Sequence, residues 1–143
     1  MSLDHAASKP HDRLAAALTD EMDAVNVLIR DRMASEHAPR IPEVTAHLVE
    51  AGGKRLRPML TLMAAHAVGK PNNATHVLAA AVEFIHTATL LHDDVVDMST
   101  LRRGRPTVNA QWNNPSSVLV GDFIYSRAFQ VLVNIGDMRI MEI

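Results

Sequence analysis

The stretch from Ala74 to about Met98 constrains the fold most, because it contains no proline or glycine and is apolar through most of its length. Alanine is frequent in this stretch, and alanine has the highest helix propensity of all residues. An apolar helix of this length has to be covered by other parts of the chain. The sequence therefore predicts one long buried helix with further elements packed around it.

The composition indicates that these further elements are also helices. Hydrophobic residues make up 48% of the 143 residues, which is enough for a core, but aromatic residues make up only 3%. Strands favour aromatic and β-branched residues, whereas helices favour alanine and leucine. We expect an all-α fold, an antiparallel array of helices that forms one domain or part of a larger one.

Apolar residues at steps of three and four predict a first amphipathic helix after Pro10. Pro39 and Pro42 interrupt this helix, and a short second helix is expected to end at Gly52 and Gly53. The apolar residues of the first helix are Leu14, Leu18, Met22, Val25 and Ile29.

A third helix is predicted to start at Pro58 and to end before Gly69, because proline fits the first helical position and glycine the end. Residues 99–114 are expected to be irregular, and no strand is predicted. Ser116 or Ser117 is expected to cap a last helix.

An acidic cluster ends the long helix, where Asp93, Asp94 and Asp97 follow the nearly uncharged residues 84–92. Asp93 and Asp97 lie one turn apart on one face, and their carboxylates repel each other unless a cation lies between them. Asp94 lies about 100° further round the helix and can widen the site. Oxygen ligands suit a hard cation such as Mg2+, which also binds substrate phosphates. A solvated helix end is the alternative, but the apolar residues before the acids favour a cleft.

Two basic segments could bind the phosphates of such a substrate. The first, residues 52–58 (GGKRLRP), combines glycines that allow close approach of the backbone with the charges of Lys54 and Arg57. The second, residues 101–106 (LRRGRP), directly follows the acidic helix. Each segment alone could be an ordinary charged loop. Both together with the acidic cluster favour a pair of diphosphate substrates.

His86 lies seven residues before Asp93 on nearly the same helix face, so its ring could donate a hydrogen bond to a phosphate. A histidine whose hydrogen bonds are satisfied within the core is the alternative. The net charge of -2 gives no indication of nucleic-acid binding, and the absence of cysteine excludes disulfides and thiolate metal sites. We expect no transmembrane segment and no secretory leader, and therefore a cytoplasmic protein.

Three segments resemble, in this chain order, those of the trans-type polyprenyl diphosphate synthases: residues 52–58, the helix that carries residues 84–97, and residues 101–104 with Asn109 beyond them. Gly121 and Asp122 resemble a further position of that family. The similarity spans about residues 45–140, and it resembles most the long-chain members that make octaprenyl, solanesyl or decaprenyl diphosphate. It implies an all-α fold of the isoprenoid synthase type, of which residues 1–143 form the N-terminal part. The implied enzyme is a prenyltransferase that condenses isopentenyl diphosphate with an allylic diphosphate.

The resemblance also implies a role for each matching residue in substrate binding. Lys54, Arg57, His86 and Arg103 would bind isopentenyl diphosphate, and Arg102 would bind the allylic diphosphate.

For the acidic motif, the resemblance implies that Asp93 and Asp97 hold Mg2+ with support from Asp94. It further implies that Ala88 and Thr89 form the floor of a tunnel for the growing product. Both residues are small, which leaves the floor open and favours a product of about eight to ten isoprene units.

The resemblance implies a homodimer and a quinone end use such as ubiquinone biosynthesis. Family members carry a second aspartate-rich motif further along the chain, and nothing comparable follows Asp97 here. We therefore expect a truncated chain that is inactive alone. The alternatives are a terpene cyclase, which would not need the segment 52–58, and a non-catalytic partner subunit of a heteromeric synthase.

Overall fold

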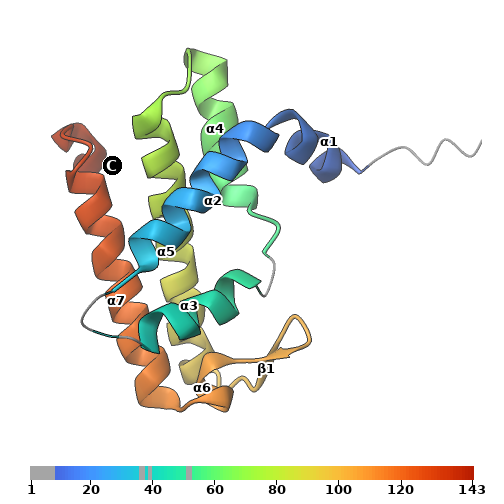
Figure 1. Cartoon of the computed structure of the whole chain (residues 1–143), viewed down its shortest axis with the longest axis vertical. Coiled ribbons are helices and arrows are strands. Elements are labelled where there is room, and N and C mark those ends of the chain that lie inside the picture. Colours follow the sequence, from blue (N-terminus) through green and yellow to red (C-terminus); the bar gives the residue numbers. More distant parts are fainter. Residues whose placement is uncertain (1–8, 36–37, 39, 51–52) are drawn as a thin grey trace, which may run out of the picture.

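The computed structural model describes residues 9–35, 38, 40–50 and 53–143, and most of them are helical (Figure 1). This confirms the predicted all-α class. Across the described residues the elements are α1 (Pro10–Ala17), α2 (Thr19–Met33), α3 (Arg40–Glu50), α4 (Leu56–Val68), α5 (Asn73–Val96), β1 (Leu101–Arg102), β2 (Arg105–Pro106), α6 (Val108–Gln111), α7 (Asn114–Val133) and a short 3-10 helix, Met138–Glu142.

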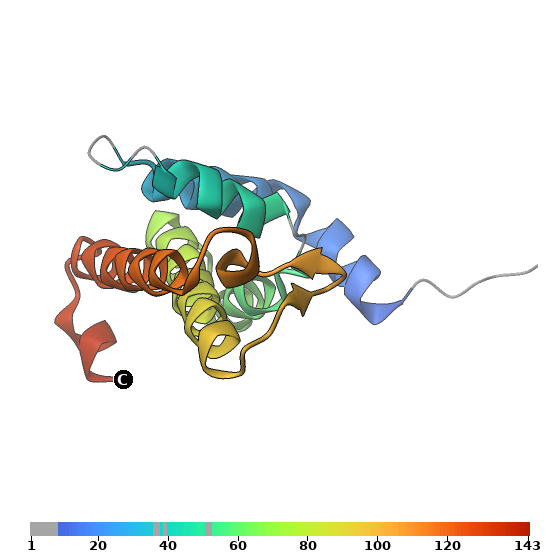
Figure 2. The same ribbon diagram turned by 90° about the horizontal axis from the view of Figure 1, so that it is seen from below.

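Helix α5 is the centre of the structure, as the sequence predicted. It packs against α7 along most of its length and also contacts α4 and α2. Figure 1 shows that α4 and α7 run antiparallel to α5, and Figure 2 shows α2 and α3 on one side of this group. Alanines on α5 let the neighbouring helices approach closely. The fully buried residues of the core include Phe84, Leu91, Leu62, Ile124 and Ile29.

The start of α5 is fixed by a capping box. The side chain of Asn72 accepts a hydrogen bond from the backbone N–H of Thr75 at 3.1 Å, and the hydroxyl of Thr75 accepts one from the N–H of Asn72 at 3.2 Å. The helix ends at Val96, within two residues of the predicted end.

By length and composition alone, α5 is long and apolar enough to cross a membrane. A core helix of a globular protein satisfies the same criterion. Because α5 contacts α2, α4 and α7, its apolar side chains have a role in this core.

The first predicted helix is divided in two at Leu18, where φ is -109° and ψ is 15°. The hydroxyl of Thr19 donates to the carbonyls of Ala15 and Ala16 at 3.2 and 3.0 Å, a local competition that bends helices. The predicted apolar face is confirmed, since Leu18, Met22, Val25 and Ile29 are buried.

Two prolines lie inside helices rather than at their borders. Pro42 is the third residue of α3 and Pro58 the third residue of α4, in the first turn where a missing N–H leaves no bond unmade. The prediction that α4 starts at Pro58 is therefore two residues late, whereas its end before Gly69 is confirmed. Gly52, at the predicted end of α3, lies outside the described residues.

The prediction of no strand is wrong, because β1 and β2 form a small antiparallel hairpin. Its two turn residues have positive φ, 51° at Arg103 and 77° at Gly104. Such a turn matches the twist of the strands, but it usually carries asparagine or aspartate at its first position, so an arginine there does not predict it. The predicted cap of α7 is also wrong: Asn113 caps the helix by accepting from the N–H of Ser116 at 2.7 Å.

Candidate functional site

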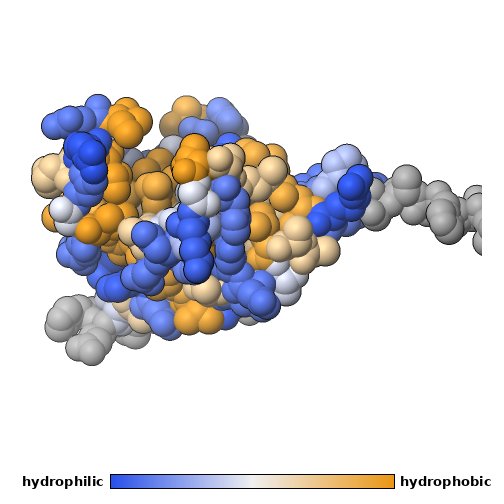
Figure 3. Space-filling view, turned by 90° about the horizontal axis from the view of Figure 1, so that it is seen from above, coloured by the Kyte–Doolittle hydropathy of each residue, from blue (hydrophilic) through white to orange (hydrophobic). Residues whose placement is uncertain are grey.

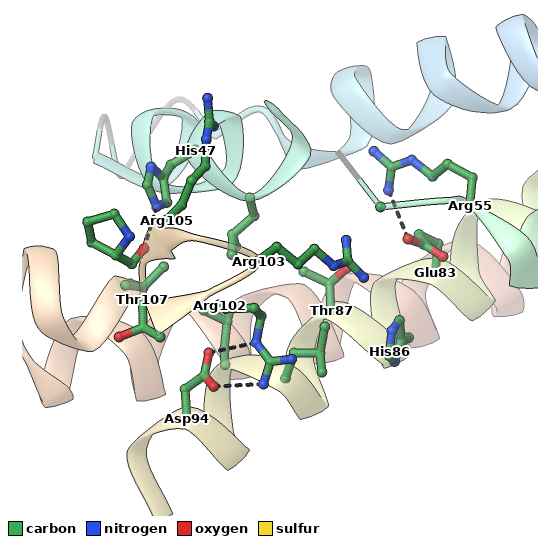
Figure 4. Close-up of a pocket in the computed structure, with 16 residues that line it drawn as sticks. His47, Arg55, Glu83, His86, Thr87, Asp94, Arg102, Arg103, Arg105 and Thr107 are labelled. Carbon is green, nitrogen blue, oxygen red and sulfur yellow. Dashed lines mark hydrogen bonds and ion pairs between the residues drawn. The ribbon is translucent and has the colours of Figure 1, made fainter. Parts of the chain in front are cut away.

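Four of the ten predicted site residues line one pocket between α5, the segment before α4 and the β1–β2 hairpin, with α3 above it (Figure 4); they are His86, Asp94, Arg102 and Arg103. Segments that are far apart in the sequence therefore supply the pocket. The charged and polar residues that line it include Arg55, Glu83, His86, Asp94, Arg102 and Arg103.

The acidic residues occupy the C-terminal end of α5. The backbone N–H of Asp97 donates to the carbonyl of Asp93 at 2.8 Å, so the two residues lie one helical turn apart, and both side chains are exposed. A helix C-terminus carries a partial negative charge, which makes it an unfavourable place for carboxylates. Cations near this end would therefore stabilise it.

Asp94 differs from its two neighbours because it is buried and already paired. Arg102 donates to both of its carboxylate oxygens, at 2.7 and 3.1 Å, and the side chain of Asp94 is 6% exposed. This two-point geometry is the strong form of an ion pair. The hydrogen bonds that Arg102 donates to Asp94 raise the pKa of Arg102, and the charges of Asp93 and Asp97 add to the effect. The interpretation that Asp94 widens an open metal site does not fit this arrangement.

Hydrogen bonds connect the segment after α5 to the acidic end of that helix. The hydroxyl of Thr107 and the side-chain amide of Asn109 both donate to the carbonyl of Ser99, at 2.8 and 3.0 Å. These bonds hold the hairpin that carries Arg102 and Arg103 close to α5.

His92 attaches the same end of α5 to α7. Its Nε2 lies 3.2 Å from the carbonyl oxygen of Val118 and 3.3 Å from a carboxylate oxygen of Asp122. A Cβ atom at Gly121 would lie 2.6 Å from Cδ2 of His92, so only glycine allows this approach.

The acidic end could hold a divalent cation only with help from other ligands. Among the described residues, no group of three or more His, Asp or Glu side chains converges on one point. Asp93 and Asp97 offer exposed carboxylates alone, which suits Mg2+, since this ion often takes one or two carboxylates and completes its shell with phosphates and water.

A cationic region lies about two helical turns before these acids. Arg57, His86 and Thr89 line a shallow hollow on the surface of α5. Burial lowers the pKa of His86, and the charges of Arg57, Arg103 and Arg102 lower it further, while Glu83 opposes them. Three arginines from two separate segments therefore act on one histidine, as expected for a phosphate site.

The two basic segments meet at Gly53. A Cβ atom at Gly53 would lie 3.0 Å from Nη1 of Arg103, so this glycine leaves room for the arginine. Lys54, the predicted point charge, is exposed and does not line the pocket. Its carbonyl oxygen lies 2.9 Å from Nε2 of His11, which connects α1 to this segment.

The sequence interpretation missed an ion pair between Arg55 and Glu83, whose Nη1 and Oε1 atoms lie 2.9 Å apart. Both side chains are largely buried, 17% and 8% exposed. One sign was available, because Glu83 is the only residue with a full charge between Lys70 and Asp93.

The two predicted tunnel residues lie on different faces of α5. Ala88 is buried in the core, whereas Thr89 is exposed and donates its hydroxyl to the carbonyl of His86 at 2.7 Å. They do not share one surface within this structure.

Comparison with known proteins gives a consistent picture. The polyprenyl synthetase family model matches residues 38–143. The octaprenyl diphosphate synthase of Escherichia coli K12 is 46% identical over 132 residues, which is 92% of this chain and 41% of that protein.

Solved structures agree with this. A decaprenyl diphosphate synthase from Rhodobacter capsulatus superposes with a TM-score of 0.90 at 69% identity over 93% of this chain and 41% of that one. A polyprenyl synthase from Caulobacter crescentus, complexed with calcium and isoprenyl diphosphate, gives a TM-score of 0.88 at 52% identity over 94% and 41%. The chain thus spans about 41% of the length of these relatives.

Proposed function

The chain belongs to the polyprenyl synthetase family, and we propose that it forms the N-terminal part of a prenyltransferase. The complete enzyme would condense isopentenyl diphosphate with an allylic diphosphate and make a long-chain trans-polyprenyl diphosphate. The observation that carries this proposal is the presence of two charge centres on α5, the exposed pair Asp93 and Asp97 at its end and Arg57 beside His86 about two turns earlier.

Each charge centre would serve one diphosphate. Lys54, Arg57, His86 and Arg103 would bind isopentenyl diphosphate directly, because arginine forks and a histidine ring match phosphate oxygens. A cationic site of this kind needs no metal.

The allylic diphosphate would lie at the acidic end, where Asp93 and Asp97 hold Mg2+. The bound ion would neutralise charge on the departing diphosphate. Arg102 would contact this diphosphate while Asp94 keeps its guanidinium in place, as their two hydrogen bonds support.

The reaction then follows from this placement. Loss of diphosphate leaves an allylic cation, the double bond of isopentenyl diphosphate attacks it, and a proton is lost. The product is one isoprene unit longer and can react again. Holding both substrates in reacting positions is the main task of the residues described above.

We further propose that residues 1–143 are part of a larger all-α domain. The exposed apolar side chains of α7, which include Leu119, Tyr125 and Val133, would be covered there. On the face in Figure 3, apolar and polar side chains are intermixed. A homodimer, a cytoplasmic location and a ubiquinone end use belong to the same proposal and rest on the family resemblance.

The test is product formation by the complete protein that contains this sequence, with isopentenyl diphosphate, geranyl or farnesyl diphosphate and Mg2+. Mass spectrometry should detect polyprenyl diphosphates of about eight to ten units, and chelation of the metal should abolish them. The 143-residue chain alone should form none. A complete protein that binds both substrates but transfers no prenyl group would contradict the proposal and favour a non-catalytic subunit.

A further inference from the structure

A buried acid interrupts the apolar part of α5. Glu83 lies among Ala79, Ala80, Ala81 and Phe84, which are all buried. A carboxylate in such surroundings is costly unless a cation and hydrogen bonds compensate it. Arg55 supplies the cation at 2.9 Å, from a residue 28 positions earlier in the chain.

The backbone of Arg55 is unusual in the same place. It precedes the first residue of α4 with φ of 50° and ψ of 32°, in the left-handed region that residues other than glycine rarely adopt. Its carbonyl oxygen accepts the N–H of Met59 at 3.1 Å. A conformation of this kind persists only when its surroundings hold it, and such residues concentrate at functional sites.

We propose that the Arg55–Glu83 pair positions the residues that bind isopentenyl diphosphate, and this inference rests on the function proposed above. Lys54 precedes Arg55 and Arg57 follows it by two residues, so the backbone at Arg55 sets where both side chains project. Glu83 lies three residues before His86, one turn away on α5. One ion pair thus connects the segment that carries Lys54 and Arg57 to the part of α5 that carries His86.

The charges agree with a positioning role rather than a direct contact with substrate. Figure 4 shows the side chains of Arg55 and Glu83 directed toward each other across the space between the loop and α5, with His86 beyond Glu83. Because Glu83 compensates Arg55, the pair adds no net charge. Arg57 and Arg103 take part in none of the ion pairs among the described residues, so their charges remain to bind the diphosphate.

The experiment uses steady-state kinetics of the complete synthase with Arg55→Gln and Glu83→Gln. Each variant should raise KM for isopentenyl diphosphate by about tenfold or more, the effect of losing one charge-assisted bond. The KM for the allylic substrate should stay within about twofold, and kcat should change less than KM. Leu62→Ala, a fully buried change on the same α4, is the control that lowers the melting temperature without moving either KM.

The double variant Arg55→Glu with Glu83→Arg separates positioning from direct binding. If the pair only positions other residues, the swapped pair should reverse part of the rise in KM for isopentenyl diphosphate that Arg55→Glu alone causes. If Arg55 binds the substrate directly, the swap should reverse none of it. If the swapped protein does not fold, the two single variants decide. Unchanged isopentenyl KM in both singles, with only a lower melting temperature, would overturn the inference. A wild-type protein without prenyl transfer would instead overturn the proposed function.

Discussion

The acidic and the cationic halves of the site are built in opposite ways. Asp93, Asp94 and Asp97 are neighbours on one helix, and their arrangement follows from helical geometry alone. The cationic half collects Arg57, His86 and Arg103 from three segments, and only tertiary packing brings them together. The acidic half is therefore a local half, which tolerates changes elsewhere in the chain. The cationic half is an assembled half, which depends on the contacts between its three segments.

The difference also appears in the two ion pairs. Asp94 and Arg102 are eight residues apart and form two hydrogen bonds, so their pair closes a short loop at the end of α5. Arg55 and Glu83 are 28 residues apart and form one, so their pair joins the segment before α4 to α5. The first stabilises the acidic end, and the second determines how the cationic half is assembled.

The largest effect is expected from the local half. In the complete enzyme, Asp93→Asn should lower kcat on the order of a thousandfold, because it removes a metal ligand that acts on the leaving diphosphate. Stopped assays at saturating substrates and Mg2+ measure this. Asp23→Asn, an exposed aspartate on α2, is the control and should leave kcat unchanged. Near-normal turnover of the Asp93 variant at limiting Mg2+ would refute the metal assignment.

A smaller effect, on one substrate only, is expected from the assembled half. Arg57→Ala should lower the affinity for isopentenyl diphosphate by roughly tenfold to a hundredfold, which is the contribution of one charge-assisted hydrogen bond. Separate titration of each substrate checks this, with Lys70→Ala in the exposed α4–α5 turn as the control for loss of a positive charge. An effect confined to the allylic substrate would mean that the two sites are exchanged.

The contrast also explains how much could be predicted from the sequence. The long helix, its acids and the buried face of α2 follow from periodicity, and the structure agrees with them. The hairpin could not be predicted, since an arginine with φ of 51° has no sequence signature. The partners of Asp94 and Glu83 could not be assigned either, because pairing between segments depends on packing that periodicity does not encode.

Product length should distinguish the two faces of α5 on which the predicted tunnel residues lie. Ala88→Phe adds a ring to a buried position and should cost about 1–3 kcal/mol of stability. Thr89→Phe changes an exposed position and should leave stability nearly unchanged.

Mass spectrometry of the products, alongside thermal unfolding, separates the two cases. If the tunnel follows the exposed face, Thr89→Phe shortens the product to roughly three or four units while the melting temperature stays constant. Shortening by Ala88→Phe alone would place the tunnel on the face that now packs into the core. Unchanged length in both variants would assign length control to other residues.

The smallest expected effect is a pH dependence of isopentenyl diphosphate binding through His86. Burial and the nearby Arg57 keep its pKa below the ordinary value of 6.5 in the free protein, so the ring is largely neutral at pH 7. A bound diphosphate would favour the charged ring and raise this pKa. Binding therefore takes up protons, and the affinity should rise as the pH falls through the pKa of the complex, levelling off below the lowered pKa of the free protein.

The pH dependence of folding stability through His86 has the opposite sign to the pH dependence of diphosphate binding. The unfolded chain has the higher pKa at His86, so this residue contributes stability above pH 6.5 that is lost as the pH falls through the lowered folded pKa. Diphosphate has its own protonation near neutral pH, and His86→Gln corrects for it, since the amide can still donate a hydrogen bond but does not titrate. Calorimetry of wild type and variant in two buffers of different ionisation enthalpy gives the proton uptake. An uptake that is equal in both proteins would remove His86 from the phosphate site and leave the assembled half to its arginines and Lys54.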